Sequence, residues 1–440
     1  MTPPRSPHPG SLAKFQRMPP ELVDHIIAFL EDSSLALKSC TLVSHAWLAT
    51  ARRLLFKELS IVVWKDAGDV FTFVSQLTAS PSHGLGRYVR HLSLDDMPLT
   101  KRFVRDRFPM NGQTMFAILE LLPNLKVLEL KSLIYSPFPS DIALHPLLQP
   151  TTATSTLEKQ YHLDRLVIHV VGVQNPDDAV ACLLDSLSVL SSIDELEILP
   201  HVEESRSGAC FGDGPRPPSN VFPRMPTIRK LFACFPYLTN GMLQGVVVEA
   251  LASTRLETLT LRACATDEHF RAVGVIVEGS KETLRNLEFE FCSWQMLRTL
   301  QDARRDWSTL NLSACTSLRT LTIHRLVKNP TSSGAPIDTS LHTLLALTPA
   351  TLRTLHIRAF ASTALQASSD GDTAKSLVEW DWAGLKKEVG RLVREGALEE
   401  IVFVSWGEVM GEDSQEVVRA GLGAELVGKV RFEMSEQKDW

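Results

Sequence analysis

The segments LRTLTI (residues 318–323) and LRTLHI (352–357) are near copies of each other. Both follow the pattern LxxLxL, and related segments recur on either side of them. The further matches are VRHLSL (89–94), LKVLEL (125–130), LDRLVI (163–168), IDELEI (193–198), IRKLFA (228–233), LETLTL (256–261), LRNLEF (284–289) and LEEIVF (398–403). Because successive matches start 28 to 46 residues apart, the chain is predicted to be an array of similar structural units.

Each match predicts a short strand, and most of the intervals between matches predict a helix. The second and third apolar residues of a match are two apart and therefore point to the same side of the strand. Apolar residues at helical spacing occupy residues 114–124, 177–192, 239–253, 266–280, 338–349 and 381–396. This alternation predicts an α/β solenoid, in which each unit buries its apolar residues against the next unit.

Over residues 85 to 410 this pattern resembles the leucine-rich repeat family, and two copies extend to the fuller form LxxLxLxxC, at 256–264 and 284–292. The resemblance implies a curved parallel sheet on the inside and helices on the outside. Long stretches that follow strands could form binding loops on one edge or be neutral excursions: 131–141, 201–220, 327–338 and 361–376. Residues 413–428 and the segment VRFEM (430–434) predict a closing helix and an edge strand.

A different pattern precedes the repeats, in the stretch MPPELVDHIIAFLEDSSLALKSCTLVSHAWLATARRLLF (18–56). Two prolines open a first helix with a broad apolar face, and Ser33 or Ser34 can cap a second helix. Ser44 can cap a third helix. About forty residues are too few for a stable isolated core. This unit is therefore predicted to need a partner surface.

The stretch is similar to the F-box family. The residues that carry the similarity are Met18, Pro19, Glu21, Leu22, Ile27, Leu30, Cys40, Val43, Ser44 and Trp47. Met18 replaces the usual leucine, which is a volume-conserving change. Together with the repeats, the layout resembles the large set of fungal F-box proteins with degenerate leucine-rich repeats.

The resemblance implies that the F-box docks on the Skp-type adaptor of a cullin–RING (SCF-type) ubiquitin ligase by placing apolar helix residues in a groove. The predicted adaptor-binding residues are Pro19, Leu22, Ile26, Ile27, Leu30, Val43 and Trp47. Some of them, Ile27 and Trp47 in particular, could instead hold the three helices together.

The resemblance also implies that the repeats bind a protein substrate. Strand periodicity places a set of mainly polar residues on the inner, concave face of the sheet. The predicted substrate-binding residues are Arg165, His169, Glu195, Glu197, Lys230, Phe232, Arg262, Glu288, Glu290, His324, His356 and Arg358. The same face is predicted to include His91, Ser93, Asp95, Glu129, Lys131, Thr258, Asn286, Thr320 and Glu400. The mixed charges favour a protein or peptide partner, although an ordinary solvated sheet face would have the same composition.

Composition and charge argue against several classes of partner. The 440 residues are 44% hydrophobic and 22% charged, which is typical of a folded globular protein. A net charge of −6 without a long basic run argues against nucleic acid and anionic membranes as partners. The apolar runs are too short for a membrane span, and residues 1–17 lack the apolar core of a signal peptide. The cytoplasm or the nucleus is the expected location.

The sequence predicts neither a metal site nor a catalytic site. No two of the seven cysteines lie within 20 residues of each other, which gives no zinc or disulfide pattern. His324 and His356 could lie diagonally on adjacent strands, but they lack a third ligand. Cys264 and Cys292 are expected to be buried turn residues. GAELVGKV (423–430) lacks the hydroxyl residue of a phosphate-binding loop.

The sequence therefore predicts a non-enzymatic, cofactor-free substrate receptor. It divides into a disordered tail (1–15), an F-box (16–57), a leucine-rich-repeat-like solenoid (58–410) and a C-terminal capping segment (411–440). An interaction scaffold without ubiquitin transfer, a receptor gated by a small molecule and a hydrolase are the alternative interpretations.

Overall fold

The repeat segments form one parallel sheet in the computed structural model. The structure describes residues 18–62, 84–95, 109–131, 134–135, 161–170, 176–200, 225–234, 243–262, 267–290, 307–327, 340–361, 377–378, 380–406 and 410–435. The predicted tail lies outside these residues, and so do most of the long stretches that follow strands. Twelve strands are hydrogen-bonded in chain order, all parallel. The α/β fold with a parallel sheet is therefore confirmed.

Each of the ten LxxLxL matches contributes its last residues to one strand of this sheet, and one further strand lies at each end. The strands are β1 (Glu58–Val62), β2 (His91–Asp95), β4 (Val127–Lys131), β6 (Tyr161–Val170), β7 (Leu190–Pro200), β8 (Thr227–Cys234), β9 (Thr258–Arg262), β10 (Asn286–Glu290), β11 (Thr320–Val327), β12 (Thr354–Ala361), β13 (Glu400–Trp406) and β14 (Val430–Ser435). A separate parallel pair consists of β3 (Pro109–Met110) and β5 (Ile134–Tyr135).

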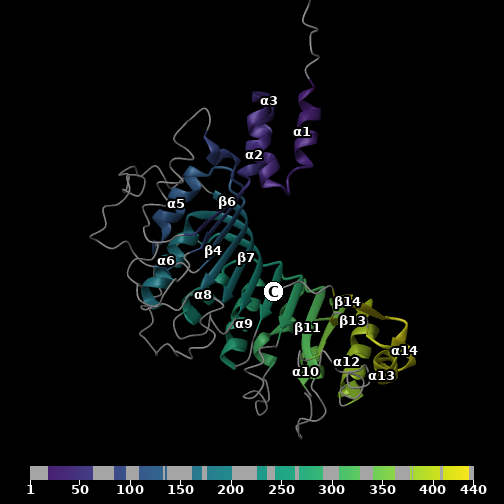
Figure 1. Cartoon of the computed structure of the whole chain (residues 1–440). Coiled ribbons are helices and arrows are strands. Elements are labelled where there is room, and N and C mark those ends of the chain that lie inside the picture. Colours follow the sequence, from purple (N-terminus) through teal and green to yellow (C-terminus); the bar gives the residue numbers. More distant parts are fainter. Residues whose placement is uncertain are drawn as a thin grey trace, which may run out of the picture.

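The helices are α1 (Pro20–Ala28), α2 (Ser34–Val43), α3 (His45–Leu55), α5 (Gly112–Leu121), α6 (Pro176–Ser188), α8 (Leu243–Ala252), α9 (Asp267–Ser280), α10 (Ser340–Ala346), α12 (Trp382–Arg394), α13 (Glu412–Leu422) and α14 (Ala424–Val427). Short 3-10 helices are η1 (Leu85–Tyr88), η7 (Trp307–Leu310) and η8 (Leu312–Ala314). Helices α5 to α12 lie along one face of the sheet, with α1–α3 at one end and α13 and α14 at the other (Figure 1).

Two predicted helices differ from the observed ones. The helix predicted over 177–192 ends at Ser188, because residues from Leu190 onward pair with β6 as part of β7. The closing helix predicted over 413–428 is divided in two at Gly423. This glycine has a φ of +82°, a left-handed conformation that interrupts a right-handed helix.

The register stacks the apolar residues of the repeats into continuous rows. Leu259, Leu287 and Leu321 are paired across β9, β10 and β11, and each is almost fully buried. Leu261, Phe289 and Ile323 form the second row across the same strands. Burying one such side chain contributes roughly 1.5–3 kcal/mol. The rows and the apolar faces of the helices form one continuous hydrophobic core.

Hydroxyl groups link the three most similar repeats to the repeats that precede them. The residue before each LxxLxL segment donates a hydrogen bond to a backbone carbonyl of the preceding repeat. Thr283 donates to Leu256 over 2.8 Å, and Thr351 donates to Leu318 over 3.0 Å. Ser317 donates to Glu282 over 2.6 Å. These bonds connect neighbouring units where each strand begins.

The first three helices form a small unit of their own, residues 18–57, which we call the helical unit. Ser33 and Ser44 cap α2 and α3 by accepting hydrogen bonds from Ala36 N and Trp47 N, as expected. The buried core of the unit is small and separate from that of the sheet: Val23, Ile27, Leu37, Cys40 and Ala51. A core of this size supports the expectation that the unit needs additional contacts.

Truncation of Phe289 is expected to destabilise the repeats strongly. Its ring is fully buried and packs edge-on against Trp307. We expect Phe289→Ala to lower the free energy of unfolding by about 3–5 kcal/mol, because it leaves a cavity between repeats. Urea denaturation measures this change. Val275→Ala is the control, since Val275 is 44% exposed on α9, and a shift above about 0.5 kcal/mol is not expected there.

Candidate interaction surfaces

Helix α1 has two apolar stripes, and only one of them faces the core. Val23 and Ile27 point inward and are 3% and 0% exposed. Leu22, Ile26 and Phe29 occupy the other side and are 53%, 40% and 77% exposed. The residues of the outward stripe do not belong to the buried core of the helical unit, and their exposed surface is accessible within the described part of the chain.

Helix α2 also carries exposed apolar side chains. Leu35 and Leu42 are 75% and 87% exposed, and Val43 at the end of the helix is 62% exposed. We call the combined set the apolar surface: Met18, Leu22, Ile26, Phe29, Leu35, Leu42 and Val43. It holds seven of the eleven strongly exposed large apolar residues in the described part of the chain. A concentration of exposed apolar residues in one small unit marks an interaction site more often than scattered exposure does.

The structure divides the predicted adaptor-binding residues into two groups. Pro19, Leu22, Ile26 and Val43 are exposed, whereas Leu30 and Trp47 are partly buried against the small core. Ile27 is completely buried, so its place is in the packing of the three helices, the alternative considered for it. Phe29, Leu35 and Leu42 were absent from the predicted set. The three-residue spacing from Ile26 to Phe29 was the available signal for Phe29.

The second surface is the face of the sheet opposite the helices, which we call the open face. Residues on this face alternate with the buried rows. By strand register it includes all twelve predicted substrate-binding residues. The side chain of Glu290 lies outside the described part, so only its strand position is known.

Arg165 on β6 pairs with two glutamates of the neighbouring strand β7. Its guanidinium lies 2.5 Å from Glu197 and 3.6 Å from Glu195, and Lys230 approaches Glu195 at 3.9 Å. Burial and the neighbouring Glu195 raise the pKa of Glu197 above its ordinary value. The pairing leaves little unbalanced charge in this part of the open face.

A second polar group lies on β10, β11 and β12. His324 Nε2 is 2.5 Å from Glu288 Oε1, and an Arg358 nitrogen is 3.1 Å from the same oxygen. Burial alone would raise the pKa of Glu288. The hydrogen bond from His324 and the nearby cations outweigh this effect, so that the pKa lies below its ordinary value. Glu288 is therefore held as a carboxylate by the His324 hydrogen bond and by the guanidinium groups of Arg358 and Arg262.

The same part of the open face contains an arginine stacked on an aromatic ring. Arg262 lies over the ring of Phe232 at 4.5 Å, a cation–π arrangement across β8 and β9. The positive charge of Arg262 also helps to lower the pKa of Glu288. Phe232, predicted as the most distinctive residue of this face, is thus partly covered by Arg262.

The two histidines considered for metal binding are diagonal neighbours, as expected. Thr322 pairs with His356, and His324 pairs with Arg358. Burial and the adjacent Arg358 lower the pKa of His356. Neither histidine belongs to a group of ligand atoms close enough to hold a metal ion among the described residues.

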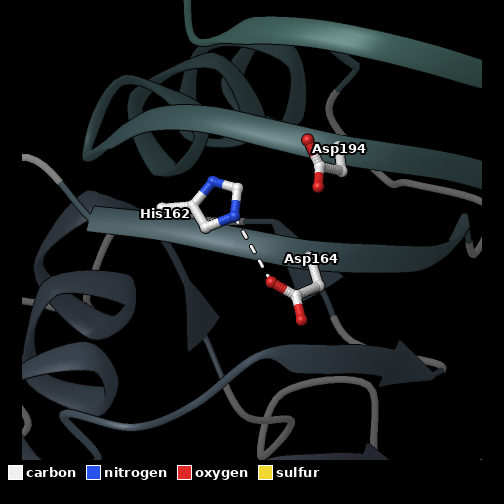
Figure 2. A group of neighbouring side chains, drawn as sticks. All are labelled: His162, Asp164 and Asp194. Atoms are coloured by element: carbon white, nitrogen blue, oxygen red, sulfur yellow. Dashed lines mark ion pairs between the residues drawn. The ribbon is translucent and has the colours of Figure 1, made fainter.

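One group with suitable ligand types does lie elsewhere in the described part, at the beginning of β6 and β7. Figure 2 shows His162 paired with Asp164, and Asp194 on the neighbouring strand. Lys126 lies 2.8 Å from Asp164, and Arg229 lies 3.5 Å from Asp194. These cations already neutralise both carboxylates, so we interpret the group as part of a network of ion pairs.

The described cysteines do not resemble nucleophiles. Cys40, Cys234 and Cys315 are buried. Burial raises the pKa of Cys315 to about 11, with a smaller contribution from Glu278, so its thiol stays protonated at neutral pH. Cys210, Cys264 and Cys292 lie outside the described residues. Within the described ranges, no helix has the length and apolar character required to cross a bilayer.

Comparison with known proteins adds no identification: no family model matches the chain, and no curated protein matches it. The arguments for function therefore come from the residues and the geometry of the two surfaces.

Replacement of Glu288 is expected to destabilise the open face in a pH-dependent way. Glu288→Gln removes the charge that His324 and Arg358 share, and should lower the free energy of unfolding by about 1–2 kcal/mol at pH 7. The folded-state pKa of Glu288 is lowered, so the difference from wild type should shrink as pH falls below about 4.3. Urea titrations at several pH values test this. Glu399→Gln, at an exposed pair with Arg353, is the control.

Proposed function

We propose that the helical unit is an F-box that docks on a Skp-type adaptor. In this proposal the sheet is a leucine-rich-repeat-like receptor for a protein substrate, and the chain is the non-catalytic substrate-recognition subunit of a cullin–RING ubiquitin ligase. The apolar surface is the observation that carries the proposal. Its apolar side chains are exposed and can contact another polypeptide, as the sequence resemblance to the F-box implies.

The apolar surface suits a groove lined by apolar side chains. Leu22, Ile26 and Phe29 are spaced four and three residues apart on α1, which is the spacing that presents anchors on one side of a helix. Burial of each large side chain contributes about 1.5–3 kcal/mol. Several such anchors can outweigh the loss of translational and rotational freedom on binding.

The connection between the helical unit and the sheet is short. Only two residues separate the end of α3 from the start of β1. The carbonyl of Lys57 accepts hydrogen bonds from the backbone of Arg90 and His91, and its side chain pairs with Glu31 at 2.5 Å. These contacts anchor the residue that joins the helical unit to β1. A substrate on the open face would then be presented to the ligase in a limited range of orientations, which favours transfer by proximity.

An interaction scaffold would use the same two surfaces without ubiquitin transfer. Co-purification of a cullin with the chain through the adaptor would distinguish a ligase subunit from such a scaffold. A receptor gated by a small molecule would instead show ligand-dependent thermal stabilisation.

Charges placed on the apolar surface are expected to abolish adaptor binding. The double variant Leu22→Glu and Ile26→Glu puts two carboxylates where the proposal places an apolar groove. We expect the affinity for a purified Skp-type adaptor, measured by calorimetry, to fall by at least about 100-fold.

The matched control is Val275→Glu, because Val275 on α9 is 44% exposed and Ile26 is 40% exposed. Its affinity for the adaptor should equal that of wild type. If wild type fails to bind the adaptor, or if the double variant binds as well as wild type, the F-box proposal is wrong.

Ile27 is expected to stabilise the folded helical unit and not to contact the adaptor. Ile27→Ala removes a fully buried side chain from the small core and should destabilise the helical unit by about 2–4 kcal/mol. Hydrogen exchange at α1–α3 should accelerate while exchange in β9–β12 stays unchanged. Equal acceleration in both regions would show that the helical unit and the sheet unfold together.

A further inference from the structure

Arg358 has donor capacity that the open face does not use. One terminal nitrogen contacts Glu288 at 3.1 Å and lies 3.3 Å from His324 Nε2. Its Nε is buried, and no described residue accepts a hydrogen bond from it. A guanidinium has five N–H donors arranged in a planar fork. The second terminal nitrogen likewise has no acceptor among the described residues, and unlike the buried Nε it is not enclosed by the protein.

The described carboxylates near Arg358, Glu288 and Glu400, already have partners. Glu288 is shared between His324 and Arg358, and Arg262 also acts on it. Glu290 is paired by register with Arg262 on one side and with His324 on the other, one strand away from Arg358. Glu400 on β13 is paired with Arg431 at 3.1 Å. Arg358 therefore keeps a terminal nitrogen without an acceptor among the described residues.

The Arg358 side chain is accessible in spite of this crowding. It is 36% exposed, whereas His324 behind it is 7% exposed. The contact with Glu288 restricts the orientation of the guanidinium, so less conformational entropy remains to be lost when a ligand binds. A partially exposed, oriented arginine is typical of the residues that dominate the affinity of protein interfaces.

We infer that Arg358 recognises the carboxylate of an Asp or Glu side chain in a polypeptide segment bound to the open face. The inference rests on the proposed function of the repeats as a substrate receptor, and it specifies the chemistry of the substrate. The carboxylate fits because it is a charged acceptor for the second terminal nitrogen of Arg358, which makes no hydrogen bond to a described residue.

The surroundings of Arg358 favour a carboxylate over the alternatives. A dianionic phosphate would bring a second negative charge close to Glu288, which touches the same guanidinium. A lysine or arginine of the partner would meet Arg358 and Arg262 and be repelled. A backbone carbonyl could accept a hydrogen bond, but without the added strength of a charged acceptor.

A peptide library with one fixed position at a time tests this inference. Full-length chain is incubated with peptides in which the fixed residue is Asp, Glu, Gln, Lys or phosphoserine. Wild type should select Asp or Glu at one position by about 10- to 100-fold over Gln, the range expected for one charge-assisted contact. Arg358→Gln should lose the preference, and Arg358→Glu should replace it with a preference for Lys.

The matched control is Arg353→Gln, which removes the same charge immediately before β12, where Arg353 is 56% exposed. Its selectivity should remain that of wild type, and thermal unfolding should show that all variants are folded. The inference is overturned if wild type selects no acidic residue, if phosphoserine is preferred to Glu, or if Arg353→Gln loses the preference equally. Adaptor binding, measured on the same samples, tests the proposed function separately, because the helical unit is unchanged in every variant.

Discussion

The stacking of apolar side chains across parallel strands is the constraint on which the rest of the structure depends. A Leu or Ile in one strand is buried by the corresponding residue of the next strand and by the helix between them. No single repeat can achieve this burial alone. The register is therefore fixed from β1 to β14, because a slip of one residue would bring polar side chains into the core. Every residue on the open face takes its position from this constraint.

The same constraint explains why the open face differs chemically between its two halves. Only the buried rows are required for folding, so the outward residues are free to form local networks. On β6 to β8, Arg165 and Lys230 balance the carboxylates of Glu195 and Glu197. On β10 to β12, His324 and Arg358 both contact the carboxylate of Glu288. The first arrangement satisfies its own charges, whereas the second leaves donors on Arg358, and this difference separates a structural network from a candidate contact.

Most of the fold could be predicted because the buried rows leave a direct pattern in the sequence. The spacing of LRNLEF and LRTLTI fixes both the strand and its inward side. The apolar stripes of α1 were harder to interpret, since Leu22 and Val23 belong to stripes of nearly equal hydrophobicity. A helical pattern alone gives no indication of which stripe meets α3. The contact of Arg262 with Phe232 also needed the structure, because it depends on the register and on the rotamers of two long side chains.

The separation of the two cores has a consequence for function. The helical unit packs around Ile27 and Leu37, whereas the sheet packs around its own continuous rows. A substitution in one core should therefore leave the other core largely intact. The backbone hydrogen bonds of Lys57 anchor the residue that joins the two parts. A molecule that bridges two proteins benefits from this combination. Each surface can change its chemistry independently, and the short connection between α3 and β1 preserves the geometry that brings the two partners together.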